Sequence, residues 1–92
     1  MLESFTLETF AGRVGERFLI RFEPGQATET ELVEAVAAGE PGPGRTPFSL
    51  VFRAPAGDPY PQAIYAVEHA ELGAFEIFLV PVAEGLYEAV FA

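Results

Sequence analysis

Glycine and proline divide the chain into short segments, and this division limits what the chain can fold into. Nine Gly and eight Pro are spread over 92 residues. Long helices are disfavoured across so many breaks, because Pro lacks a backbone donor and Gly costs conformational entropy. Between the breaks, apolar residues alternate with polar ones. The pattern therefore predicts short strands joined by turns.

Alternation is clearest from Arg13 to Phe22, where we predict a strand with one buried face. Phe18, Ile20 and Phe22 fall on that face, and a turn at residues 23–25 ends the strand. Runs rich in β-branched and aromatic residues predict further strands. These lie at residues 48–53, 63–69, 75–82 and 86–91, and the last three are expected to form an antiparallel meander. The run at 75–82 is almost continuously apolar, so we expect it to be a central strand.

Residues 28–38 fit two structures. Thr28 and Glu31 match a capping box, which would begin a helix with Leu32 and Val36 on one face. A strand would separate apolar from polar residues less cleanly between its two faces. The local pattern favours the helix, so a strand here needs support from outside the segment.

The length of the chain predicts one domain, formed by residues 1–92. We expect an all-β fold, namely a small antiparallel barrel or sandwich of about six to seven strands with at most one short helix. Half the residues are hydrophobic and nine are Phe, which supplies the side chains for a core.

Charge and composition exclude several classes of function. Acidic residues outnumber basic ones 14 to 5, and the formal net charge is −9. We expect neither nucleic acid nor an anionic membrane as a partner, because both require a cationic surface. The chain has no Cys, which excludes disulfides and thiolate metal sites. No cationic leader segment is visible near Met1, so we expect a cytoplasmic protein, and one without a cofactor.

Several motifs in the second half are similar to those of a known family. They are PFSLVFRAP at residues 47–55, Gln62 followed by IYAVEHAELG at 64–73, FLVPV at 78–82 and YEAVF at 87–91. The chain resembles an uncharacterised family of short bacterial proteins, labelled a domain of unknown function. In its relatives the part that matches Thr30–Val36 reads as a strand, so the resemblance favours a strand over residues 28–38. It also implies an association with phage-tail-like proteins, which are encoded near some members.

Three arginines are candidates for anion binding. Arg13, Arg17 and Arg21 share strand parity and would line one face together with Leu19. Such a row can hold a carboxylate or another anion. In so acidic a chain we favour the alternative, in which each Arg pairs with a Glu on a neighbouring strand.

His69 and several glutamates are the candidates for catalysis or metal binding. His69 is the only His, and Glu68 and Glu71 lie close to it in the sequence. On a strand Glu68 and His69 point to opposite faces, so we favour a structural His whose ring bonds the backbone of the next turn. Glu68, Glu76 and Glu88 lie on three consecutive predicted strands, but with 14 acidic residues some proximity is expected by chance. We therefore assign no catalytic or metal-binding residue.

Two aromatic residues are candidates for partner binding. Tyr60 lies between Pro59 and Pro61, and an aromatic ring on a stiffened loop can anchor a partner. Phe91 lies on the strand 86–91, which we expect to be the unpaired edge of the sheet. This edge predicts a homodimer or a contact with another protein.

Together these patterns predict a non-enzymatic interaction or structural module, and the resemblance suggests an accessory of a phage-tail-like assembly. Two alternatives stay open. A small-ligand-binding β-barrel would need an enclosed cavity of about 300 Å³ or more. An enzyme would need carboxylates that converge in the fold.

Overall fold

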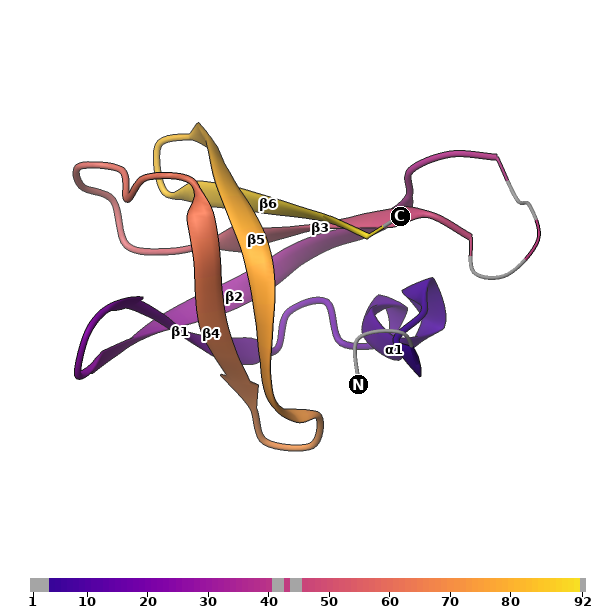
Figure 1. Ribbon diagram of the computed structural model, residues 1–92, viewed down its shortest axis with the longest axis horizontal. Helices are drawn as coiled ribbons and strands as arrows, with labels where there is room; N and C mark the ends of the chain where they lie inside the picture. The colour runs from indigo at the N-terminus through magenta and orange to yellow at the C-terminus, as the bar shows by residue number, and fades with distance from the viewer. Residues whose placement is uncertain (1–3, 41–42, 44–45, 92) are drawn as a thin grey trace.

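The computed structural model describes residues 4–40, 43 and 46–91. Within these residues, six antiparallel strands close into a barrel with one short helix beside it (Figure 1). The prediction of a small all-β barrel is therefore confirmed. The elements are α1 (Leu7–Ala11), β1 (Arg17–Glu23), β2 (Gln26–Ala37), β3 (Phe48–Arg53), β4 (Ala63–His69), β5 (Gly73–Ala83) and β6 (Leu86–Phe91).

The strands follow the order β1-β2-β3-β6-β5-β4 around the barrel, and β4 pairs with β1 to close it. β4, β5 and β6 pair in succession, as predicted for the meander. β6 pairs with β3 along its whole length and with β5 over Leu86–Glu88. The prediction of β6 as an open edge is therefore wrong for Leu86–Glu88, where the strand has β3 on one side and β5 on the other.

Two predicted segments differ from the local pattern. β2 covers most of residues 28–38, so the strand favoured by the resemblance is confirmed and the helix is wrong. Pairing with β1 and β3 satisfies its backbone groups, which outweighs a weak local preference for a helix. β1 begins at Arg17 rather than Arg13, because the chain turns at Gly15, whose φ is 96°. Between β2 and β3, residues 41–42 and 44–45 lie outside the described part.

Phenylalanine rings from several elements fill one end of the barrel. Phe10 of α1 is fully buried, and its ring centroid lies 5.4–6.3 Å from those of five other Phe rings. A helix of five residues is unstable alone, so this packing must hold α1 in place. No helix in the described residues is long and apolar enough to span a membrane.

A tyrosine cluster closes the other end. Phe22 stacks on Tyr60 with a centroid distance of 4.6 Å and an interplanar angle of 4°. The same ring contacts Tyr65 and Tyr87. The backbone N–H of Tyr60 donates to the Tyr87 hydroxyl at 2.9 Å. The Pro-rich loop after β3 is thereby fixed against the barrel.

Candidate functional site

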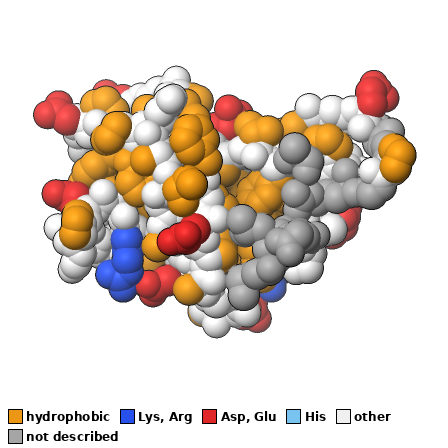
Figure 2. Space-filling view, viewed as in Figure 1, with side chains coloured by type: hydrophobic (Ala, Val, Ile, Leu, Met, Phe, Trp, Pro, Cys, Tyr) orange, Lys and Arg blue, Asp and Glu red, His pale blue; other side chains and the backbone are white. Residues whose placement is uncertain are grey.

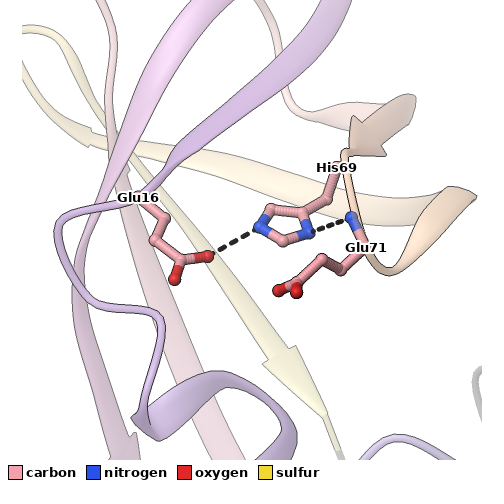
Figure 3. Close-up of side chains that lie close together, drawn as sticks. All are labelled: Glu16, His69 and Glu71. Atoms are coloured by element: carbon pink, nitrogen blue, oxygen red, sulfur yellow. Dashed lines mark hydrogen bonds and ion pairs between the residues drawn. The ribbon is translucent and has the colours of Figure 1, made fainter.

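Three parts of the chain converge at the end of β4, around His69 (Figure 3). The His69 side chain is only 4% exposed, and its Nε2 lies 2.8 Å from Oε1 of Glu16, just before β1. The imidazole also packs on Phe18, with centroids 4.5 Å apart. Glu71 follows in the β4–β5 turn. This cluster is the only group in the described residues where His and acidic side chains could share a metal ion.

The hydrogen bonds of His69 fix which nitrogen carries the proton. Nδ1 accepts from the backbone N–H groups of Glu71 at 3.1 Å and Leu72 at 3.2 Å. Nδ1 must therefore be unprotonated, and Nε2 carries the hydrogen that it donates to Glu16. The prediction of a His whose ring bonds the turn backbone is confirmed. The ring also ties the turn to the start of β1.

The same tautomer bears on metal binding. Ligand atoms of Glu16, His69 and Glu71 lie within 4.8 Å of one another. A metal on Nε2 requires Nδ1 to carry the proton and donate it to an acceptor, but here two N–H donors face Nδ1. Arg13 already supplies positive charge, with nitrogens 3.2 Å from Glu71 and 3.9 Å from Glu16. We therefore assign the cluster a structural role.

The three arginines proposed for anion binding all have carboxylate partners, and the predicted cross-strand ion pairs are confirmed for Arg17 and Arg21. Arg13 lies in the turn before β1, and only Arg17 and Arg21 share the outer face of that strand. All three pairs are accessible to solvent, so each contributes roughly 0.2–1 kcal/mol. They are Arg13–Glu71 at 3.2 Å, Arg17–Glu29 at 3.4 Å and Arg21–Glu68 at 2.9 Å.

A surface groove of about 1160 Å³ runs beside these pairs. Leu19 lines it, together with Arg17 of β1 and Glu29 of β2, which pair with each other. Arg53 and Glu31 also line it and pair at 2.7 Å. These opposite charges satisfy one another, which gives the groove little means to select a charged ligand.

The predicted carboxylates do not gather into one site. Glu68 is bound to Arg21. Glu76 lies opposite Ala66 on β4, whereas Glu88 lies opposite Val80, four residues further along β5. The register therefore keeps Glu88 apart from the other two.

The two aromatic residues predicted as partner anchors both pack against the barrel, with Phe91 buried and Tyr60 half-buried. Phe91 is 6% exposed, and its ring stacks on Phe48 at 4.5 Å. Tyr60 packs against the core, and its hydroxyl donates to Glu23 at 2.9 Å. This hydrogen bond raises the pKa of Tyr60 above 10.0, and burial raises that of Tyr65. Both rings proposed as partner anchors thus serve the barrel itself.

An exposed apolar surface lies instead on the outside of β4 and β5. Ile64 and Phe78 face each other across these strands and are 65% and 50% exposed. Val82 is 51% exposed, and Ala66 and Val80 are half-buried. We call these five residues the outer patch. Figure 2 shows hydrophobic side chains gathered over both strands.

Three acidic residues surround the outer patch, namely Glu76, Glu84 and Glu88, and we call them the acidic frame. Glu76 precedes it on β5, Glu84 follows it in the turn, and Glu88 lies opposite Val80 on β6. The described arginines are all engaged in ion pairs, and one of these pairs, Arg21–Glu68, lies beside the patch, two residues from Ala66 on β4. The continuous apolar run hid this surface from the sequence interpretation. The usable signal was the parity of Glu76 with Phe78, which assigns both residues to the solvent face.

A family model described as Domain of unknown function (DUF6916) matches residues 5–91. The chain belongs to this family. The match spans every element from α1 to β6 and confirms the resemblance seen in the sequence motifs. No curated protein and no solved structure matches the chain in the corresponding comparisons. The family description states no activity, so function has to be argued from the surface of the barrel.

Proposed function

We propose that this domain is a non-enzymatic protein-interaction module, and that the outer patch is its docking surface. The observation that carries the proposal is the pairing of Ile64 and Phe78 across β4 and β5, both at least half exposed. Contiguous apolar surface of this kind is typical of a contact with another protein. Burying one large apolar side chain contributes roughly 1.5–3 kcal/mol, so Ile64 and Phe78 can supply part of the free energy of binding.

The acidic frame specifies the chemistry of the partner. Glu76, Glu84 and Glu88 surround the outer patch, and the chain has a net charge of −9. A complementary surface has an apolar centre and Lys or Arg around it. A second copy of the chain fits less well, because a symmetric contact would bring two acidic frames together.

The ligand-binding alternative finds less support. Phe10 and Phe18 are fully buried in the barrel, where a ligand-binding barrel would keep its cavity. Catalysis would need a free acid–base pair, whereas His69 uses both of its ring nitrogens in structural bonds. A cytoplasmic adaptor in a phage-tail-like assembly is the specific role that we propose, and it rests on the association implied by the family resemblance.

The test compares two surfaces of the same protein. One variant carries Ile64→Thr and Phe78→Ser in the outer patch. The matched control is Val36→Thr on β2, which is 42% exposed and lies two strands from β4 and three from β5 around the barrel. Each immobilised protein is used to capture partners from the native host, and circular dichroism verifies that each is folded. Captured proteins are then purified and titrated calorimetrically at low and high salt.

We expect a partner that binds the wild type and the control equally and the patch variant at least about tenfold more weakly. Its affinity should fall with added salt, because the acidic frame contributes to binding. Equal capture by the patch variant would place the interface elsewhere and refute the proposal. Light scattering measures the oligomeric state of both proteins. If the wild type forms a dimer and the patch variant does not, the partner at the outer patch is a second copy of the chain and not another protein.

A further inference from the structure

Over its first half, β5 pairs with only one neighbour among the described strands. Its residues 73–79 lie opposite β4, whereas β6 joins β5 only from Val80 to Ala83. Beyond that point β6 runs away from β5 (Figure 1). Among the described strands, none pairs with the second edge of residues 74–79. We call this stretch the free edge.

On the outer face of the free edge, the side chains of Ala74, Glu76 and Phe78 are exposed. Phe5 and Phe10 close the interior behind it, with ring centroids 5.1 Å and 6.3 Å from that of Phe75. Edges of natural sheets are usually protected by Lys, Pro or a bulge. The free edge has one charged residue, Glu76, while Pro81 and the neighbouring bulge lie beyond it. Its own sequence therefore does not prevent another strand from pairing there.

The free edge and the outer patch share Phe78. A strand added beside β5 would place alternate side chains on the outer face, next to Glu76 and Phe78. We propose that the partner adds an extended segment to the free edge as an extra strand. An apolar residue of this segment lies beside Phe78, and an Arg or Lys lies beside Glu76. The inference rests on the proposed function and specifies the form of the partner.

Charge favours a foreign segment over a second copy of this chain at the free edge. A second copy would bring its own net charge of −9 and its own Glu76. A segment with alternate basic residues neutralises the acidic frame instead. In strand addition, main-chain hydrogen bonds provide affinity and the alternating side chains provide specificity.

The probe is a phage-displayed library of linear decapeptides, selected on the wild-type protein. An enriched peptide is synthesised unmodified, N-methylated at odd positions, and N-methylated at even positions. Successive amides of a strand point to opposite sides, so only one methylated form loses its bonds to β5. By fluorescence anisotropy we expect that form to bind at least about tenfold more weakly and the other within about threefold of the unmodified peptide.

Two charge reversals test the side-chain part of the inference. Glu76→Arg should weaken binding of the unmodified peptide at least about tenfold. Glu34→Arg, on the exposed face of β2, should leave the affinity for this peptide unchanged. Equal effects of the two methylated forms, or no enriched peptide, would overturn strand addition. If Phe78→Ser abolishes binding while neither methylated form differs from the unmodified peptide, the proposed docking surface survives and the added strand does not. A peptide unaffected by Phe78→Ser would count against both.

Discussion

Replacing His69 by Phe tests whether the buried imidazole fixes the end of β4. Phe keeps a ring against Phe18 but removes the acceptor at Nδ1 and the donor at Nε2. Three hydrogen bonds are lost, one to Glu16 and two from the turn amides. Each contributes roughly 0.5–1.5 kcal/mol. Because water can reach the turn and replace some of the lost hydrogen bonds, we expect the free energy of unfolding to fall by about 2–3 kcal/mol.

A second substitution separates this account from one based on charge or metal binding. In Glu16→Gln the amide oxygen can still accept from Nε2–H, so the loss should stay below about 1 kcal/mol. A charged imidazole or a metal ion would instead need the carboxylate. One equivalent of Zn²⁺ should leave the wild-type stability unchanged, because a ligand that binds the folded state would raise it.

The measurement is urea unfolding followed by far-UV circular dichroism, since the chain has no Trp. His69→Phe within about 0.5 kcal/mol of the wild type would show that the three bonds do not stabilise the turn. A rise of the unfolding midpoint with Zn²⁺ would refute the tautomer argument.

Three further predictions concern the stability of the barrel and use the same urea assay. Gly85→Ala should lower the free energy of unfolding by at least about 2 kcal/mol, because its new Cβ would lie 2.9 Å from a backbone carbonyl oxygen. Gly25→Ala is the control, with a similar positive φ but open space around it, and it should lower the free energy of unfolding by about 1 kcal/mol. Equal losses in the two variants would contradict the clash. Since the pKa values of Tyr60 and Tyr65 are raised above 10.0 on folding, stability should hold up to about pH 10 and fall as the pH rises through the folded pKa values; a midpoint that increases above pH 10 would contradict this. Phe10→Ala should lower the free energy of unfolding by about 3–5 kcal/mol, because the residue is fully buried. A decrease below about 1 kcal/mol would mean that α1 does not close the barrel.

The strands themselves could be predicted closely from the sequence. β3, β4 and β6 match the predicted ranges 48–53, 63–69 and 86–91 residue for residue. Loops or turns rich in Pro, Gly or acidic residues lie between them, so the alternation has sharp ends. α1 was missed, because five residues carry too little periodicity and Phe10 is held by contacts distant in sequence.

Strand neighbours and the candidate surfaces were harder to predict. A period of two shows which side chains are buried, but it does not show which strand lies alongside, so β6 was taken for an edge. The bond from His69 to the turn is local and was predicted. Its bond to Glu16 depends on the pairing of β1 with β4 and was not. The outer patch was missed because an apolar run was taken as buried on both faces.

Closure of the barrel by β1 against β4, and of β3 against β6, also determines when the chain can fold during its synthesis. Leu19 pairs with Glu68, and Phe48 pairs with Phe91, so neither contact forms until late segments have been made. The hairpin of β1 and β2 emerges first, with Phe18 and Phe22 exposed until β4 and the Tyr60 loop arrive. Such long-range pairing places the barrel among slowly folding β domains, on the order of milliseconds to seconds. A growing chain of this protein therefore presents its aromatic core to the cell before the barrel can bury it.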